Sequence, residues 1–411
     1  MLQPWWSPRS EAGKLTLLAS LYISQGLPYG FLTQAVPTLL RQQGASLTQI
    51  GDASLLMLPW LLKFLWAPTV DRTWSASVGR RRSWILPLQA LTALTLGSLA
   101  LADPTNAIPL LLGVTWLTAL FSSTQDIATD GLAVSLLTER ERGLGNGVQV
   151  AGYRLGMVIG GGALLVVFSR VGWSASFLAM AGLLVLATLP TLVWREPTHD
   201  ETAEGPAETL RQVFTRPGMP TWLGLLVVYK VGEQLGGAVT KPMLVDLHLD
   251  LETIGWLGAA DSGASLMGAL TGGWLTGRMT RRRALVGFGL LQATGVLAWV
   301  LPVVASPTLS TIAAVKVYDG FVGSMATAAL FTAMMDACRP SSGGTDYTVQ
   351  ASVVLVAGFL GAALGGRTAD ALIAVLGGNG PGYAAHFALA TALTIVGALV
   401  IGAVRTRPVT A

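Results

Sequence analysis

Two aspartates, Asp126 and Asp130, lie four residues apart in the apolar stretch LFSSTQDIATDGLAV, residues 120–134. At that spacing both carboxylates lie on the same face of a helix, where two ionised groups repel each other. One of them must therefore be protonated or must meet a cation. A carboxylate that changes its protonation state can carry a proton, and a pair of carboxylates can also hold a hard cation such as Mg²⁺. The pair predicts either proton-linked or metal-linked chemistry.

The composition shows in which solvent this pair must lie. Of the 411 residues, 52% are apolar and only 12% are charged, a balance that soluble proteins of this length do not need. We therefore predict an all-α protein that crosses a lipid bilayer many times. The single cysteine, Cys338, excludes an internal disulfide, and the three histidines form no ligand cluster. The sequence predicts no cofactor and no bound metal.

Membrane-spanning segments follow from the length of the apolar runs, since a helix needs about 20 mostly apolar residues to cross the hydrocarbon core. The predicted spans, twelve in all, cover approximately residues 15–40, 48–70, 84–102, 108–136, 145–168, 173–194, 219–245, 253–277, 284–304, 308–336, 346–376 and 383–404. The N-terminus, the even-numbered loops and the C-terminus hold eighteen Lys or Arg residues, whereas the odd-numbered loops hold two. This bias predicts that both termini are cytoplasmic, and it explains the net charge of +4 without a nucleic-acid partner.

The chain divides into two predicted bundles of six helices, residues 1–194 and 218–411, joined by a polar cytoplasmic linker at 195–217. Three pairs of short sequence matches about 200 residues apart indicate a parallel internal repeat. The pairs are LTQIG (47–51) with LETIG (251–255), GRRRS (79–83) with TRRRA (280–284), and GVQVA (147–151) with TVQAS (348–352). Two repeated bundles with cytoplasmic ends are typical of the major facilitator architecture.

The loop after the second span resembles the loop signature of that superfamily. Asp71 and Arg72 are followed by GRRR, although the insertion TWSASV separates the two parts. We predict that Asp71, Arg72 and Arg80 act in gating at the cytoplasmic face. The alternative is that the arginines only provide the positive charge of a cytoplasmic loop.

Ionisable residues inside the predicted spans are the strongest functional signal. A charge at mid-membrane costs about 2.5 to 3.5 kcal/mol, so such residues face the interior, pair with one another and mark substrate or proton pathways. Four of the five lysines are in this set, and a lysine changes its protonation more readily than an arginine when it is desolvated. The basic members are Lys63, Arg154, Lys230, Lys241, Lys316 and Arg367, and the acidic members are Asp126, Asp130, Glu233, Asp261 and Asp319.

In the second bundle, spacing predicts two pairs. Lys230 and Glu233 are three residues apart on one helix, and Lys316 and Asp319 are three apart on another. Each pair is either part of a substrate or proton site or a structural ion pair that allows a polar helix to insert.

In the first bundle, depth in the membrane predicts the partners. Lys63, Asp126 and Arg154 lie at nearly the same distance from the cytoplasmic end of their spans, so we predict that they form one charge cluster. Asp126 is the predicted coupling or binding group. Asp130, nearer the cytoplasm, is predicted to act in gating or as a structural partner.

Neutral residues complete the predicted site. In SQGLPYG, Pro28 and its flanking glycines predict an interrupted first helix, and broken helices in transporters often border the substrate site. Gln25 and Tyr29 offer hydrogen-bonding groups there, and Trp60 can stack on a ligand or simply pack. Glycines at four-residue spacing in GYRLGMVIGGG predict close helix packing.

These segments resemble a known family. SQGLPYGF, LKFLWAPTVDR, STQDIATDGLAV, ERGLGNGVQVAGYRLGMVIGGG and YKVGEQ are similar to the AmpG-type branch of the major facilitators. That branch includes muropeptide permeases, the acetyl-CoA transporter and the RhtX/FptX-type siderophore importers, and GLPYGFLTQAVPTLLRQQG and RGLGNGVQV look closest to the last group. The resemblance implies a secondary transporter of the bacterial inner membrane that imports a ferric siderophore, driven by the proton gradient. The alternative is a permease for muropeptides or another bulky anionic solute.

Roles follow from this resemblance and from the intramembrane charges together. The predicted substrate-binding residues are Gln25, Tyr29, Trp60, Lys63, Arg154, Lys230, Gln234 and Lys316, and the predicted proton-coupling residues are Asp126, Glu233 and Asp319. The expected partners are the solute and the lipid bilayer, and we expect a monomer. A prenyl transferase that uses the Asp126–Asp130 spacing as a Mg²⁺ site is the enzyme alternative; it is disfavoured because the chain lacks a second acidic motif on a facing helix.

Overall fold

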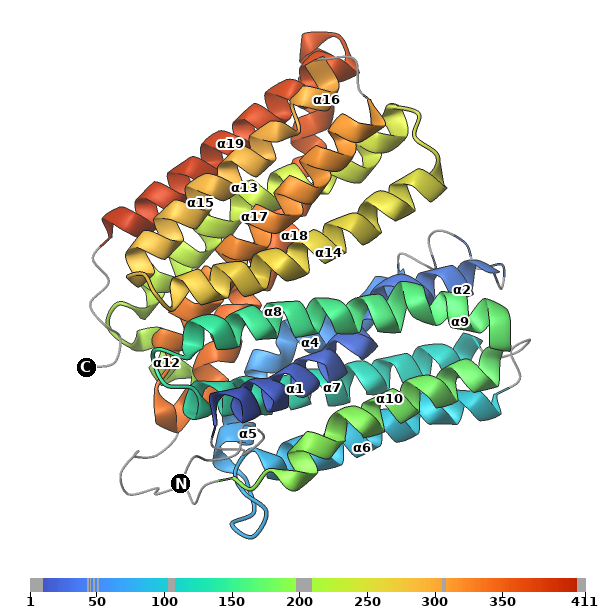
Figure 1. The fold of residues 1–411 in the computed structure, drawn as a ribbon, viewed down its shortest axis with the longest axis vertical. Coiled ribbons are helices and arrows are strands. Elements are labelled where there is room, and N and C mark those ends of the chain that lie inside the picture. The colour runs from blue at the N-terminus through green and yellow to red at the C-terminus, as the bar shows by residue number, and fades with distance from the viewer. Residues whose placement is uncertain are drawn as a thin grey trace. The chain divides into compact units, whose positions relative to one another are not determined.

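The computed structural model describes residues 10–42, 44, 46, 49, 52–102, 108–196, 209–304 and 308–404. Within these ranges the chain is helical and contains no strand, only an isolated bridge between Ser75 and Gly79 (Figure 1). This confirms the all-α prediction. Most of the predicted linker, the LTQIG match and both ends of the chain lie outside the described residues.

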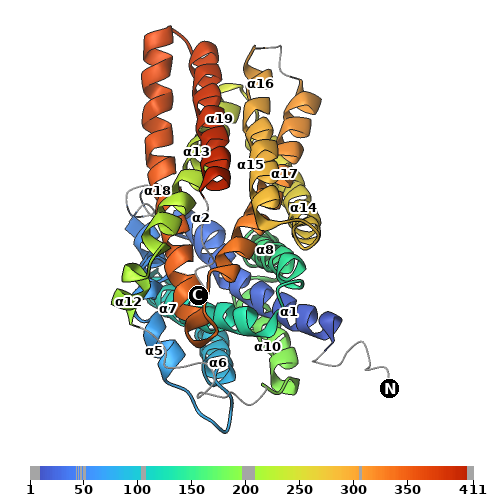
Figure 2. The same ribbon diagram turned by 90° about the vertical axis from the view of Figure 1, so that its left-hand side faces the viewer.

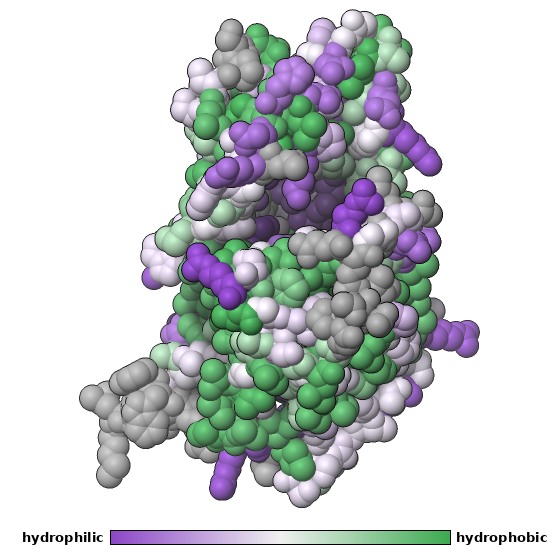
Figure 3. Space-filling model, turned by 90° about the vertical axis from the view of Figure 1, so that its right-hand side faces the viewer, coloured by the Kyte–Doolittle hydropathy of each residue, from purple (hydrophilic) through white to green (hydrophobic). Residues whose placement is uncertain are grey.

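Among the described residues, six helical segments are long and apolar enough to cross a membrane. They are Arg82–Leu101, Arg142–Val171, Trp173–Val193, Arg281–Val304, Pro340–Leu376 and Asn379–Ala403. Further long helices carry polar or ionisable residues along their length: α1 (Glu11–Gly30), α7 (Ile108–Leu136), α13 (Met219–Asp246), α14 (Leu251–Thr276) and α17 (Leu309–Asp336). Large apolar side chains are exposed on the outer faces, as Figure 3 shows in green, which suits contact with lipid.

Contacts divide the chain into two compact units. Unit 1 comprises Met1–Thr138, Gly152–Gln212 and Cys338–Ser352, and unit 2 comprises Glu139–Ala151, Val213–Ala337 and Val353–Ala411. Each unit therefore contains one short segment from the other half of the sequence. The predicted division into bundles 1–194 and 218–411 remains a prediction.

Unit 1 is built on close packing between α1 and α8 (Arg142–Val158). A Cβ on Gly156 would lie 2.3 Å from the carbonyl oxygen of Ile23, and a Cβ on Gly26 would lie 2.1 Å from that of Tyr153. The glycine face on α8 thus packs backbone to backbone, as predicted. After Pro28, α1 continues as a π-helical turn, Phe31–Ala35, which is the form that the predicted interruption takes.

The rest of unit 1 surrounds this pair. The α6 helix (Arg82–Ser98) packs against α7 and α10 (Trp173–Val193), and both of these pack against α1. Their contact surfaces form an apolar core that includes Phe31, Leu96 and Phe177.

Unit 2 packs α13, α14, α15 (Arg281–Ala298), α17 and α19 (Asn379–Ala403) side by side (Figures 1 and 2). The closest approach is between α14 and α17. A Cβ on Gly268 would lie 2.1 Å from the carbonyl oxygen of Phe321, and one on Gly272 would lie 2.5 Å from the Cα of Met325. The α18 helix (Gly343–Leu376) begins in unit 1 and continues in unit 2.

Candidate functional site

The first predicted contact lies between Lys63 and Asp126 in unit 1. The Lys63 ammonium donates to Asp126 Oδ2, and both residues are buried. Lys63 begins a 3₁₀ turn after α4 (Leu58–Leu62), whereas Asp126 lies in the middle of α7. The predicted partnership of these two residues is confirmed.

Arg154 does not join this pair. It is half-buried on α8 and makes no ion pair within the described residues, so the predicted three-residue cluster is wrong in this respect. The reason is that equal depth in a membrane does not fix the direction in which each helix turns its side chain. Tyr153, its neighbour, is directed toward the site instead, because its ring lies 5.4 Å from that of Tyr29.

Asp130 has a different environment from Asp126. The hydroxyl of Tyr22 on α1 donates to Asp130 Oδ1 at 3.0 Å, and Asp130 is buried. This contact fits the predicted role of structural partner. Tyr22 was not predicted from the sequence, because nothing in the pattern of α1 distinguishes it from other buried apolar residues.

Neutral polar side chains lie close to Tyr22 along α1, at Ser24 and Gln25. Gln89 and Gln125 both donate to the Ser24 hydroxyl, at 3.0 and 3.3 Å. Gln25 is 1% exposed, and neither polar atom of its side chain hydrogen-bonds to a described residue. A buried carboxamide without protein partners is costly unless water or a ligand binds it.

Aromatic rings border the same region of unit 1. The rings of Tyr29 and Trp60 meet edge to face with centroids 5.5 Å apart. Trp60 is buried, and it precedes Lys63 by three residues, so the aromatic group and the ion pair are neighbours along the chain. The predicted residues Gln25, Tyr29, Trp60, Lys63 and Asp126 therefore all belong to the interior of unit 1.

Unit 2 contains the second predicted pair. Lys230 Nζ lies 2.5 Å from Glu233 Oε2 and 3.3 Å from the Thr327 hydroxyl of α17. The predicted pair is confirmed, and Lys230 is buried. Gln234, the residue after Glu233, packs against α18: a Cβ on Gly361 of α18 would lie 2.7 Å from the Cβ of Gln234.

The pairing predicted for Lys316 is wrong. Lys316 Nζ lies 3.4 Å from Asp261 Oδ2 on α14, whereas Asp319 accepts a hydrogen bond from Trp299 Nε1 at 2.9 Å. The close packing of α14 and α17 explains the change of partner. A Cβ on Gly320 would lie 2.0 Å from Asp261 Oδ1, so this glycine provides the space for the Asp261 carboxylate.

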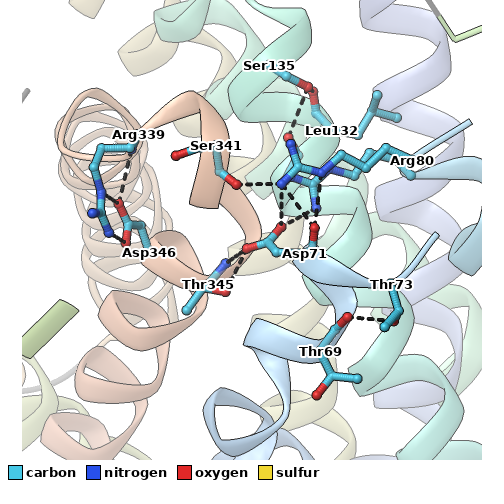
Figure 4. Close-up of polar contacts among 12 residues, drawn as sticks. Thr69, Asp71, Thr73, Arg80, Leu132, Ser135, Arg339, Ser341, Thr345 and Asp346 are labelled. Carbon is cyan, nitrogen blue, oxygen red and sulfur yellow. Dashed lines mark hydrogen bonds and ion pairs between the residues drawn. The ribbon is translucent and has the colours of Figure 1, made fainter. Parts of the chain in front are cut away.

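Asp71, at the end of α5 (Ala67–Arg72) and beyond the predicted second span, is the centre of a buried cluster in unit 1 (Figure 4). Its Oδ2 accepts from the backbone N–H and the hydroxyl of Thr345, at 2.7 and 2.6 Å. Thr345 lies in the first turn of α18, where a carboxylate is favoured by the helix dipole. Burial alone would raise the pKa of Asp71, but Arg81 and the bonds from Thr345 outweigh it, so this pKa lies below its ordinary value.

The arginines of this cluster differ from the prediction. Arg81, rather than Arg80, forms the close ion pair with Asp71, with NH1 2.5 Å from Oδ1. Arg80 also contacts Asp71, as predicted: its NH2 lies 4.0 Å from Asp71 Oδ1, and it donates to the backbone carbonyls of Asp71 and Ser341. Arg72 is exposed.

A second charge cluster, in unit 2, was not predicted as a gate. Asp336, at the end of α17, is bound by Arg142 (2.9 Å) and by Arg281 (2.5 Å). Arg281 belongs to the TRRRA motif, and Arg142 comes from the segment that the first half of the sequence contributes to unit 2. The sequence match between GRRRS and TRRRA was the signal that could have indicated it.

Both units are thus helical assemblies with charges paired inside them and with charge clusters at helix ends. No described group of His, Cys, Asp or Glu side chains is arranged to hold a metal ion. Ion pairs inside such helical assemblies are typical of substrate or ion pathways in membrane proteins.

Comparison with known proteins identifies the family. The family model of the Major Facilitator Superfamily matches residues 18–232, and the chain belongs to this superfamily, in its AmpG-type branch. The chain is 29% identical over 369 residues to the anhydromuropeptide permease of Escherichia coli (strain K12), covering 86% of this chain and 73% of that protein. It is 24% identical over 348 residues to putative transporter AmpG 4 of Rickettsia conorii, covering 81% and 84%.

Solved structures support the same fold. The chain matches the E. coli fucose:proton symporter FucP with a TM-score of 0.66 at 13% identity, covering 95% of this chain and 99% of that one. It matches the human organic anion transporter MFSD10 with a TM-score of 0.68 at 15% identity and the same coverage. These findings confirm the predicted superfamily and branch, and they confirm a secondary transporter of the membrane rather than an enzyme.

Proposed function

We propose that the protein is a proton-coupled importer of an anhydromuropeptide-type solute across the bacterial inner membrane, working by alternating access. The observation that carries the mechanism is the buried Lys63–Asp126 pair in the apolar interior of unit 1. An ion pair in such a place is expected at a substrate or proton site. The solute class is supported by the similarity to the anhydromuropeptide permease over most of the chain.

The siderophore prediction gains no support from these relatives. The alternative solute in that prediction is a muropeptide, and one relative is named an anhydromuropeptide permease. The cationic side chains of Lys63 and Lys230 suit either solute, because the muropeptide and the ferric siderophore are both bulky and anionic. We therefore give the muropeptide precedence and keep the ferric siderophore as the competitor in the test.

The roles of individual residues are part of the proposal. Gln25, Tyr29, Trp60 and Lys63 in unit 1 would bind the solute, and the unpartnered carboxamide of Gln25 supports this role. Arg154, half-buried and without an ion-pair partner among the described residues, is available to a solute carboxylate.

Unit 2 contributes the remaining roles. Lys230, Gln234 and Lys316 would take part in binding, and Glu233 and Asp319 are candidates for proton coupling together with Asp126 of unit 1. The internal position of these groups supports the assignment, since ionisable groups are rare inside membrane proteins and are usually functional there.

The two charge clusters at helix ends would form the cytoplasmic gate. Each joins residues from both halves of the sequence: Asp71 with Thr345 in unit 1, and Arg142 with Asp336 in unit 2. Alternating access requires such contacts to break and reform. The twelve-span topology, the cytoplasmic termini and the monomeric state belong to this proposal as well.

Ligand-induced stabilisation of the purified protein tests the solute. A solute that binds the folded state raises the melting temperature in proportion to the logarithm of its concentration above Kd. We expect an anhydromuropeptide to raise it and a ferric siderophore to leave it unchanged, with the effect weakened in Lys63→Met and retained in the matched variant Lys14→Met of an N-terminal lysine. Stabilisation by the siderophore alone would overturn the solute assignment.

A further inference from the structure

Three charged residues of unit 2 form a group with one amino group and two carboxylates. Asp261 on α14 lies 3.4 Å from the Lys316 ammonium of α17, and Asp319 is one turn further along α17. No lysine or arginine among the described residues forms an ion pair with Asp319. Its partner is neutral, the indole N–H of Trp299 at 2.9 Å.

The charges of this group do not cancel. The charged groups that act on Asp319 are Lys316 on its own helix, Asp261 on α14 and Glu233 on α13. Glu233 is already neutralised by Lys230. One ammonium therefore faces two carboxylates, and the group is electrically neutral only when one carboxylate holds a proton. All three residues are half-buried on helices of the predicted membrane domain, where an unpaired charge is costly and the neutral form of the group is favoured.

The geometry decides which carboxylate holds the proton. Asp261 is fixed against α17, because its carboxylate lies over Gly320 and the Ser265 hydroxyl of the same helix donates to the Gly320 carbonyl oxygen at 3.1 Å. Lys316 is bound to this fixed group. Asp319 has only the neutral indole, and it is therefore the carboxylate that takes the proton.

The position of Lys316 allows it to change partner. Residues three apart on a helix are neighbours, so the ammonium reaches Asp319 by a change of side-chain rotamer alone. The Lys316 ammonium also lies 5.7 Å from the Trp299 ring, whose indole binds Asp319. The three side chains and this indole thus form one contiguous group.

We propose that Asp319 carries the transported proton, that Lys316 alternates between Asp261 and Asp319, and that Asp261 is the positioning residue that holds Lys316 away while Asp319 is protonated. This inference rests on the proposed proton-coupled function and assigns its coupling group. The step is an acid dissociation: Asp319 releases its proton, the ammonium of Lys316 keeps its own and moves to the new carboxylate, and no other bond changes.

Infrared difference spectroscopy of the purified protein between pH 5 and pH 8 tests the proposal without any solute. The carboxylic acid C=O band reports protonated carboxyl groups, and its position reports their hydrogen bonds. Asp319→Asn is expected to remove one carboxylic acid per protein. Asp261→Asn is expected to remove it as well, because Lys316 then pairs with Asp319 and holds it ionised. Lys316→Met is expected to add one, because both carboxylates must then be neutral.

Two further variants show that the signal is specific. Trp299→Phe removes the indole donor, so the band of Asp319 is expected to move to higher frequency with unchanged area. Asp52→Asn changes an exposed aspartate of unit 1 and is expected to leave the band as in the wild type. An unchanged band in Asp319→Asn, or a band that persists in Asp261→Asn, would overturn the proposal.

Transport measurements separate this inference from the proposed function. In vesicles, Asp261→Asn is expected to retain exchange of labelled anhydromuropeptide at equal concentrations and to lose accumulation driven by a proton gradient. If the wild type fails to transport the anhydromuropeptide while the infrared results hold, the solute assignment fails and the proton site stands. If exchange and accumulation are both retained, Asp261 does not position the coupling group.

Discussion

The replacement Asp71→Asn would test the buried cluster at the start of α18. In the wild type, the Asp71 carboxylate binds Arg81 through one oxygen and Thr345 through the other. Asparagine can still accept one hydrogen bond from Thr345, but it has no charge for Arg81. Arg81 is 1% exposed, so its guanidinium would remain buried without an ionic partner.

The magnitude follows from the cost of such a group. Removing one partner of a buried ion pair destabilises the structure that buries it by about 3 to 5 kcal/mol. The state in which α18 leaves Asp71 does not carry this cost, because water then reaches Arg81. At the lower end of the range, about 3 kcal/mol corresponds to roughly a hundredfold increase in the population of the open state.

The single cysteine of the chain provides the assay. Cys338 is 2% exposed and lies in the segment of unit 1 that leads into α18, where its Sγ accepts a hydrogen bond from Gln350. A maleimide can reach it only when this segment opens. When closing is fast relative to labelling, the labelling rate is proportional to the open population. We expect Asp71→Asn to label about a hundredfold faster than the wild type.

The control is Asp52→Asn, the same chemical change at an exposed aspartate in unit 1. It should label at the wild-type rate. If the labelling rate of Asp71→Asn is also within about twofold of the wild-type rate, the free energy of opening has changed by less than about 0.5 kcal/mol. In that case Asp71 does not hold α18, and the gate assignment fails.

Three further predictions concern the Asp71 cluster and the Lys63–Asp126 pair of unit 1. Because the pKa of Asp71 lies below its ordinary value, the stability that its carboxylate gives to the closed segment is fully present above about pH 4 and is lost as the pH falls through the lowered pKa. The rate of Cys338 labelling, normalised to that of a free thiol, should therefore be constant from pH 5 to 8. Gly344→Ala places a Cβ 2.9 Å from Asp71 Oδ1 and should cost about 1 to 3 kcal/mol, measured as faster Cys338 labelling, and wild-type labelling would contradict the close approach. Lys63→Met and Asp126→Asn should each lower stability by about 3 to 5 kcal/mol in detergent, while the double variant should be more stable than either, and additive losses would show that the two do not interact.

The sequence predicted which residues are chemically important better than it predicted their partners. The intramembrane charges stood out because a charge in hydrocarbon is costly and therefore rare. Lys230 and Glu233, three residues apart on one helix, were paired correctly, whereas the same spacing gave the wrong partner for Lys316. Spacing on one helix therefore permits an ion pair, but the neighbouring helices decide whether it forms.

Pairs between helices needed information that the sequence does not carry. Lys316 binds Asp261 rather than Asp319 because α14 and α17 approach closely at Gly320, which no single-helix pattern reveals. Arg154 was predicted at the depth of Asp126, but among the described residues Asp126 forms its ion pair with Lys63 and not with Arg154. The contact between Lys63 and Asp126 was predicted from depth, and there the helix rotations agreed.

The gate shows a similar limit. Its loop was recognised from Asp71 and the arginines that follow, but the closest ion pair of Asp71 is with Arg81, while the predicted Arg80 lies 4.0 Å from the same carboxylate. Thr345 lies 274 residues from Asp71. No periodicity connects residues so far apart, although the neighbouring Gly344 leaves the space that the carboxylate needs.

The central claim, proton-driven import of an anhydromuropeptide, is tested most directly by uptake in vesicles that contain the purified protein. With the outside acidic, labelled anhydromuropeptide should accumulate inside above its external concentration. A protonophore should abolish the accumulation, and Asp319→Asn, which removes the proposed proton carrier, should lose it while Asp52→Asn should retain it. Equal uptake by protein-free vesicles, or accumulation that persists in the presence of the protonophore, would contradict the account.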